Sequence, residues 1–181
     1  MPSSPLKVVV VVGNPKVASR TRTVGEEVAR QAAAAGGVDD FDMAIVELGE
    51  VGGELFDFGS ARVKALVDRV SEADLVVVAS PTYKASYTGL LKAFLDWFGQ
   101  TALHGAVAVP VMVGGNPVHS LAPEVFLRPL LVEVGAMVPT RGLFMLEADM
   151  DRLTDVVAEW AEVARPALAR TLAAHEGAGE R

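Results

Sequence analysis

A loop rich in hydroxyl and cationic side chains follows the first apolar run of the chain and leads into a segment with helical spacing of apolar residues. It covers residues 13–23 and reads GNPKVASRTRT. The first N–H groups of a helix lack acceptors within the helix and carry partial positive charge, and Ser, Thr and Arg add hydrogen bonds to an anion. The pattern therefore favours a bound phosphate group. An ordinary helix start, with Ser19 as N-cap and the arginines in solvent, is the alternative.

Positive charge is concentrated around this loop. Residues 1–25 contain four cations and no acid, which gives +4, whereas the whole chain carries -7 and the remainder therefore -11. An acidic chain of this kind argues against general nucleic-acid binding, which rests on phosphate neutralisation. The loop contains neither Gly-x-Gly-x-x-Gly nor Gly-x-x-x-x-Gly-Lys-Ser/Thr, so a dinucleotide Rossmann site and a Walker ATP site both lose support.

A second candidate loop, SPTYKASYTG at residues 80–89, holds both tyrosines of the chain. Tyrosine rings, hydroxyls and backbone amides at the end of a strand suit a flat heteroaromatic ring, which needs apolar faces and a few hydrogen bonds at its edge. A hydrophobic plug over the core is the alternative interpretation.

A third loop, GGNPVH at residues 114–119, is uncharged and lets a ligand approach the backbone closely, although Gly-Gly is also an ordinary turn. Its His119 is expected to begin a helix, and the isolated His104 and His175 are expected at the surface. The histidines are scattered and the chain has no cysteine, so we expect no metal site and no disulfide.

Five apolar runs alternate with five longer segments of helical spacing, and all three loops follow such runs. Nearly continuous apolar strands are typical of a parallel sheet covered by helices on both faces, and such sheets bind ligands beyond the carboxyl ends of their strands. The expected strands are Leu6–Val12, Ala44–Leu48, Leu75–Ala79, Ala106–Val113 and Leu143–Leu146. The expected helices are Thr21–Ala35, Ala61–Ala73, Gly89–Gln100, Leu121–Val134 and Asp151–Ala174.

Length and composition predict one α/β domain over residues 1–181, with residues 176–181 as a tail. The chain has 181 residues, of which 51% are hydrophobic, so a sizeable core is expected. Its longest apolar run, Val8–Val12, is far too short to cross a bilayer, and no leader pattern opens the chain. We therefore expect a soluble, cytoplasmic protein.

Together the three loops resemble the NADPH-dependent FMN reductase family of flavodoxin-like proteins. Residues 13–23 are similar to the family's phosphate loop Gly-Ser-x-Arg-x-x-Ser-x-Thr, with Asn14 and Lys16 replacing two usual residues. The most specific part is Ser-Pro-x-Tyr-x-x-x-Tyr-x-Gly at residues 80–89, followed by Leu-Lys-x-Phe-x-Asp at residues 91–96. The resemblance is closest to the small reductases that supply reduced flavin to two-component alkanesulfonate-type monooxygenases.

The resemblance implies a flavodoxin-like three-layer sandwich, with a five-stranded parallel sheet in the order 2-1-3-4-5 and FMN between the first and third strands. It also implies hydride transfer from NADPH or NADH to FMN, no catalytic side chain, and a homodimer or homotetramer. The residues that it assigns to the flavin are Asn14, Ser19, Arg20, Thr21 and Thr23 in the phosphate loop, Pro81, Thr82, Tyr83, Lys84 and Tyr87 along the ribityl chain and ring, and Gly114 and Gly115 at the ring edge.

Three other functions stay open: an FMN-holding quinone or azo reductase, a non-enzymatic electron carrier, and a flavodoxin-like scaffold that binds partners without a cofactor. The carrier is disfavoured because its Thr/Ser-x-Thr-Gly-x-Thr loop is absent, and because Lys16, Arg22 and Lys84 leave positive charge for a second phosphorylated ligand. Some flavin-supplying relatives have an inserted Tyr where Val125 stands here, so release or retention of FMN also stays open.

Two structural expectations concern helices near the site. Pro129 cannot donate its backbone hydrogen bond, so the helix around it should be irregular. The helix Leu90–Phe98 has apolar residues over more of its circumference than one sheet contact needs, so we expect it to form part of an oligomer interface.

Overall fold

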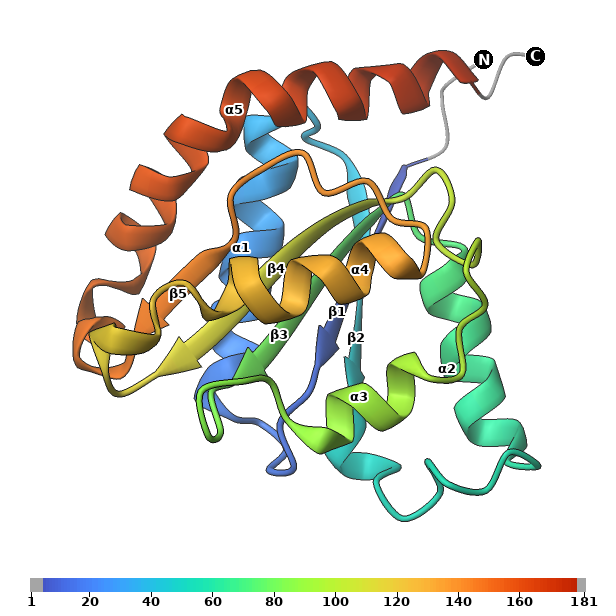
Figure 1. Cartoon of the computed structure of the whole chain (residues 1–181). Coiled ribbons are helices and arrows are strands. Elements are labelled where there is room, and N and C mark those ends of the chain that lie inside the picture. The colour runs from blue at the N-terminus through green and yellow to red at the C-terminus, as the bar shows by residue number, and fades with distance from the viewer. Residues whose placement is uncertain (1–4, 179–181) are drawn as a thin grey trace.

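The computed structural model describes residues 5–178, and side chains of the last helix up to residue 172. It contains one parallel sheet of five strands in the order β2-β1-β3-β4-β5 (Figure 1). This order confirms the expected flavodoxin-like arrangement, with the strand order reversing between β1 and β3. The strands are β1 Leu6–Val12, β2 Phe41–Glu47, β3 Leu75–Pro81, β4 Val107–Gly114 and β5 Leu143–Leu146.

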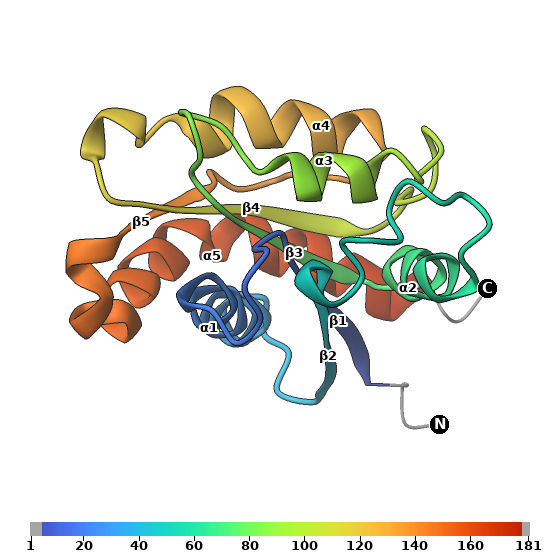
Figure 2. The same cartoon turned by 90° about the horizontal axis from the view of Figure 1, so that it is seen from below.

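Helices cover both faces of the sheet, so the molecule has three layers (Figures 1 and 2). Helices α1 and α5 pack on one face, and α2, α3 and α4 pack on the other. The α-helices are α1 Arg20–Ala35, α2 Ala61–Ser71, α3 Gly89–Leu95, α4 Arg128–Glu133 and α5 Leu153–Ala178. Shorter helical segments are the 3₁₀ turns η1 Leu48–Glu50, η2 Pro117–His119 and η4 Glu147–Arg152, and the π-helix η3 Pro123–Leu127.

Alternation along the central strand explains the two cores. Val8, Val10 and Val12 pack towards α1 and α5, whereas Val9 and Val11 pack towards the opposite helices. All five are buried, as expected for a strand with neighbours on both sides and helices on both faces.

Helix α1 approaches the sheet closely at Gly25, where an added Cβ would lie 2.7 Å from Val10 Cγ1. The glycine is needed here for space. This close seating brings the start of α1 directly beyond the ends of β1 and β3.

Element boundaries differ from the expected ones where local polarity is misleading. Strand β2 begins at Phe41, three residues before the expected start. The exposed Asp42 near its beginning interrupts the apolar residues that would indicate a strand. Helix α3 ends at Leu95, and α5 begins only at Leu153, after a 3₁₀ segment. Helix α5 runs to Ala178, so residues 176–178 of the expected tail are helical, and residues 179–181 lie outside the described part.

The helix expected over Leu121–Val134 is irregular, as Pro129 indicated. Arg128 N–H bonds to Pro123 O, five residues back, which is the π-helical pattern, and a regular α-helix starts only at Arg128. Pro129 is the second residue of α4, where a backbone N–H would have no acceptor within the helix. The lack of an N–H in proline therefore loses no hydrogen bond at the point where the helix type changes.

The expected reason for an oligomer interface on Leu90–Phe98 is wrong. Leu91, Phe94, Leu95 and Phe98 are all buried inside this chain, in the core between α3 and the sheet. The loop after η1 helps to cover this helix, because Trp97 Nε1 donates to Leu55 O at 2.9 Å. Within residues 5–178 no helix is both long enough and apolar enough to span a membrane.

Candidate functional site

The loop after β1 is held to the sheet and folded on itself. Gly13 N–H donates to Ala79 O at 2.8 Å, which continues the pairing of β1 with β3 past the strand end. The Asn14 side chain accepts Lys16 N–H at 2.9 Å and donates to Thr21 Oγ1 at 3.0 Å. Asn14 thus ties the loop to the first turn of α1, a role that fits its place in the expected site.

Helix α1 begins with an N-cap made by Ser19. Its Oγ accepts Arg22 N–H at 3.4 Å, and the Ser19 side chain and Thr21 are both buried. Thr23 is exposed, and its hydroxyl lies 3.5 Å from Ser19 O. The N–H groups of Arg20 and Thr21, in the first turn, have no intrahelical acceptors, so the arrangement provides donors for an anion.

Carboxylates already engage two of the loop's three cations. Arg20 Nη2 lies 3.0 Å from Glu147 Oε1, with the Arg20 side chain 60% exposed. Arg22 pairs with Glu26 at 2.6 Å and with Glu47 at 3.4 Å. The hydrogen bond to Glu26, together with its charge, raises the pKa of Arg22 above its usual value. Arg22 is therefore not spare charge for a second ligand, contrary to expectation.

The loop after β3 forms a tight turn. Tyr83 N–H donates to Ser86 O at 2.8 Å and Ser86 N–H to Tyr83 O at 3.1 Å. The two residues between them, Lys84 and Ala85, have φ values of 52° and 67°. Two left-handed residues of this kind form a type I′ turn, which usually contains Asn or Gly, so this turn is strained. It presents Tyr83 and Lys84 to solvent, whereas Tyr87 is half-buried against the core.

Thr88 joins this loop to the first one. Its Oγ1 donates to Gly13 O at 2.6 Å and accepts Leu91 N–H at 3.1 Å as the N-cap of α3. Its own N–H donates to Ser80 Oγ at 3.1 Å. One buried residue thereby fixes the distance between the two candidate loops.

The floor between β3 and β4 combines a missing side chain with an unpaired hydroxyl. An added Cβ on Gly114 would lie 2.8 Å from Phe144 Cζ and 3.1 Å from Thr82 Oγ1. Thr82 N–H donates to Val113 O at 2.7 Å, but the buried Thr82 Oγ1 has no partner among the described residues. A buried polar atom of this kind is uncommon and fits a ligand that supplies the missing hydrogen bond.

The three expected loops meet at the edge where the strands end, as Figure 2 shows in a view onto that edge. Asn14 bonds to Thr21 in the first turn of α1, which Ser19 caps, and Thr82 and Gly114 form a second cluster, with Pro81 buried at the end of β3. Gly115 is exposed beyond that floor, and Thr23 points into solvent one turn along α1. The residue types and the free N–H groups fit FMN, with an anion at α1 and a flat ring above the floor.

Sequence reasoning missed three residues that shape these loops: Glu47, Thr88 and Glu147. Thr88 carried a recognisable signal, since a threonine before a helix is a common N-cap. The two glutamates carried none, because each reaches the site from a different strand end. His119 closes η2 rather than beginning a helix, His104 is exposed as expected, and the side chain of His175 lies outside the described residues.

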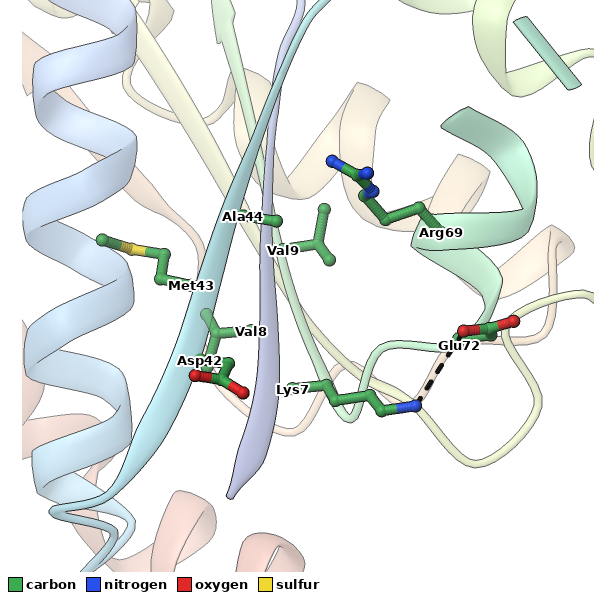
Figure 3. Close-up of a pocket in the computed structure, with 8 residues that line it drawn as sticks. All are labelled: Lys7, Val8, Val9, Asp42, Met43, Ala44, Arg69 and Glu72. Carbon is green, nitrogen blue, oxygen red and sulfur yellow. Dashed lines mark ion pairs between the residues drawn. The ribbon is translucent and has the colours of Figure 1, made fainter. Parts of the chain in front are cut away.

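A surface depression lies at the opposite end of the strands, between β1, β2 and the end of α2 (Figure 3). Its charged residues are of both signs, and Lys7 Nζ lies 3.9 Å from Glu72 Oε2. None of the expected site residues line it, so it is separate from the candidate site. The lining residues are Lys7, Val8, Val9, Asp42, Met43, Ala44, Arg69 and Glu72.

A parallel sheet in the order 2-1-3-4-5, with a phosphate-suited helix start and an aromatic loop at its switch point, defines a flavodoxin-like protein with a candidate flavin site. Residues 6–151 match the sequence model of the NADPH-dependent FMN reductase family, and the chain belongs to this family.

Relatives and solved structures agree with the family. The chain is 32% identical over 154 residues to the FMN reductase (NADPH) of Pseudomonas aeruginosa, covering 82% of this chain and 81% of the relative. It is 38% identical over 87 residues to the FMN reductase (NADPH) of Escherichia coli, covering 48% of this chain and only 46% of that relative. The apo structure of an NADH:FMN oxidoreductase superposes with a TM-score of 0.72 at 32% identity, covering 87% of this chain and 89% of that one. The chain is an oxidoreductase of the NAD(P)H:FMN type.

Proposed function

We propose that this chain reduces FMN with NADPH or NADH at the edge where β1, β3 and β4 end. The observation that carries the proposal is the pairing of two unlike features across one bridging residue. On one side of Thr88 are the free donors at the start of α1, and on the other is the floor of Gly114 and Thr82. The first suits the FMN phosphate and the second suits the ribityl chain and ring.

The candidate residues fall into two groups, one for the phosphate of FMN and one for its ribityl chain and ring. Ser19, Thr21 and the first N–H groups of α1 hold the phosphate dianion, and Arg20 adds a charge-assisted bond after leaving Glu147. Thr82 Oγ1 donates to the flavin, and Tyr83 and Tyr87 cover its apolar surface. When bound, FMN supplies the hydride-accepting ring atom, so the protein needs to orient two rings and exclude water rather than move a proton.

Lys16 and Lys84 are proposed contacts for the phosphates of the nicotinamide nucleotide. Both are exposed, and neither makes an ion pair with the residues that the structure describes. They stand on the loops after β1 and β3, so a second phosphorylated ligand entering over the flavin passes between them. Arg22 is left out of this role because two carboxylates hold it.

FMN is proposed to be a substrate that enters and leaves, with reduced flavin passed to a flavin-dependent monooxygenase in the cytoplasm. Support comes from the openness of the site: Tyr83 is 53% exposed and Arg20 stands mostly in solvent. A homodimer or homotetramer would use a surface over η2, η3 and α4, where the apolar side chains are exposed. That surface contains Val118, Leu121, Val125, Phe126 and Val132.

The test follows nicotinamide oxidation at about 340 nm under anaerobic conditions, with NADH and NADPH compared and free FMN varied as the second substrate. Turnover that saturates with added FMN supports reduction of an exchanging flavin. Bound FMN that nicotinamide cannot reduce would overturn the proposal in favour of an electron carrier. Turnover independent of added FMN, with quinone or azo acceptors, would indicate a flavin that stays bound.

A further inference from the structure

Glu47 is a buried carboxylate beside the loop that follows β1, and neither the sequence motifs nor the proposed chemistry uses it. It is the last residue of β2, in register with Val12 at the end of β1. Its side chain is only 7% exposed. A buried charge is costly unless it is paired and hydrogen-bonded, so its partners indicate what it does.

The main partner of Glu47 is the backbone of Ala18. Ala18 N–H donates to both carboxylate oxygens, at 3.0 Å to Oε1 and 3.2 Å to Oε2. Ala18 has a φ of 50°, the left-handed region that a residue with a Cβ enters at an energetic cost. A charge-assisted hydrogen bond to its amide offsets that cost and fixes the Val17–Ala18 peptide plane, one residue ahead of Ser19, the N-cap of α1.

A second contact from the same strand end supports the loop from behind. An added Cβ on Gly49 would lie 2.6 Å from Pro15 O and 3.1 Å from Asn14 O, so the backbone of η1 packs directly against the loop. The charge of Glu47 is balanced by Arg22, whose Nη1 lies 3.4 Å from Oε1. The end of β2 and the backbone of η1 therefore support the loop directly, and Arg22 on α1 balances the charge of Glu47.

We propose that Glu47 is a positioning residue for the FMN phosphate: it holds Ala18 in its left-handed conformation, and so sets the N–H groups at the start of α1 for a phosphate dianion. This inference rests on the proposed function, since it assumes FMN as the ligand of the loop. It assigns to Glu47 the preference for FMN over riboflavin, which has the same ring and no phosphate. Glu47 itself does not touch the flavin.

The experiment compares FMN and riboflavin affinity in Glu47→Ala with the matched control Glu26→Gln. Both carboxylates pair with Arg22, but only Glu47 accepts Ala18 N–H. We expect Glu47→Ala to weaken the affinity for FMN roughly tenfold and the affinity for riboflavin hardly at all. Glu26→Gln should change neither affinity. Equal losses in both variants would mean that Glu47 acts only through Arg22, which overturns the proposal.

Rescue separates positioning from general destabilisation. Glycine adopts a positive φ at no steric cost, so Ala18→Gly in the Glu47→Ala background should restore much of the FMN preference. Failure of this rescue, with FMN and riboflavin weakened alike, would make Glu47 a purely structural residue.

A flavin-free measurement keeps this inference distinct from the proposed function. Hydrogen exchange at the Ala18 amide should be slow in the wild-type protein and fast in Glu47→Ala, whatever ligand the loop binds. Unchanged exchange would overturn the positioning role directly. Slow exchange in a wild-type protein that binds no FMN would retain the loop geometry and contradict the proposed function instead.

Discussion

The loop after β1 and the loop after β3 lie side by side, but the protein holds them by different means. Carboxylates at the ends of other strands hold the first, where Glu47 accepts Ala18 N–H and Glu147, directly after β5, pairs with Arg20. The second closes on itself by backbone hydrogen bonds between Tyr83 and Ser86.

The difference corresponds to the two ends of the proposed ligand. A site for an anion needs hydrogen-bond donors that are fixed in direction. Here carboxylates, buried or partly buried, fix the backbone and the arginine that supply those donors. A site for a ring needs shape, which a strained turn and a glycine floor provide. Changes in the first loop should therefore discriminate between FMN and riboflavin, and changes in the second should not.

The largest effect that would sharpen this contrast is expected for Arg20→Ala. Loss of one hydrogen bond to a dianion should cost about 1.5–3 kcal/mol of FMN affinity, or roughly tenfold or more in Kd, with riboflavin binding nearly unchanged. Fluorescence titration with both flavins measures it. Arg30→Ala, on the same helix and also ion-paired, is the control and should leave both affinities intact. An equal loss for the two flavins would remove Arg20 from the phosphate site.

Gly114→Ala should weaken the binding of FMN and of riboflavin equally, by about 2 kcal/mol each, because the added Cβ would clash with Phe144 and Thr82 within the floor. Gly115→Ala is the control, since the nearest atom to its Cβ is Glu147 Oε2 at 3.7 Å, an ordinary contact. Thermal unfolding without flavin separates a filled floor from a destabilised fold. A loss confined to FMN would contradict the division between phosphate loop and ring floor.

Thr82→Val should weaken both flavins by about 1 kcal/mol and leave the flavin-free protein as stable as before or more so. The reason is that the buried Thr82 Oγ1 finds no partner in the part of the chain that the structure describes, so its removal loses no hydrogen bond there until a ligand arrives. Thr140→Val is the matched control, because the Thr140 hydroxyl is also buried with no partner within residues 5–178, and it should leave flavin binding unchanged. Unaltered binding in Thr82→Val would show that the hydroxyl does not meet the flavin.

The smallest effect is expected for Glu124, which links the π-helix η3 to Gly142, the residue before β5. Burial alone would raise the pKa of Glu124, but hydrogen bonds from Arg128 and from Gly142 N–H outweigh it, so the pKa lies below its usual value of 4.5. Stabilisation from this group is present above that value and disappears as the pH falls through the lowered pKa. Glu124→Gln should cost about 0.5 kcal/mol at neutral pH and show a shallower loss of stability in acid. Denaturant unfolding at several pH values measures it, and a wild-type profile that matched the variant's would contradict the assignment.

Much of the architecture could be predicted from the sequence because buried parallel strands are nearly continuous in apolar residues. The strands Leu6–Val12 and Leu143–Leu146 occur with the expected bounds. Strand β2 was harder, because the exposed Asp42 interrupts the apolar residues near its start. Pro129 indicated an irregular helix, but the π-helical pattern depends on where Arg128 N–H finds an acceptor, which local sequence does not determine.

The sequence could indicate the three candidate loops, whose residues are consecutive, but not the contacts that the fold creates between distant residues. The three loops could be found because each is a local motif at a strand end. Glu47 could not, since it reaches Ala18 only through the register of β2 beside β1. The pairing of Arg20 with Glu147 joins residues 127 positions apart, and no local pattern indicates it.

The bond from Thr88 to the carbonyl of Gly13 has a consequence for how the site forms and opens. It joins residues 75 positions apart and lies at the boundary of both loops, so neither loop reaches its final geometry until β3 has docked beside β1. The loop after β1 and the loop after β3 therefore belong to one cooperative unit, and thermal fluctuations should open both loops together. A nascent chain in which β1 and α1 alone have emerged would display the whole phosphate motif and still be unable to bind flavin.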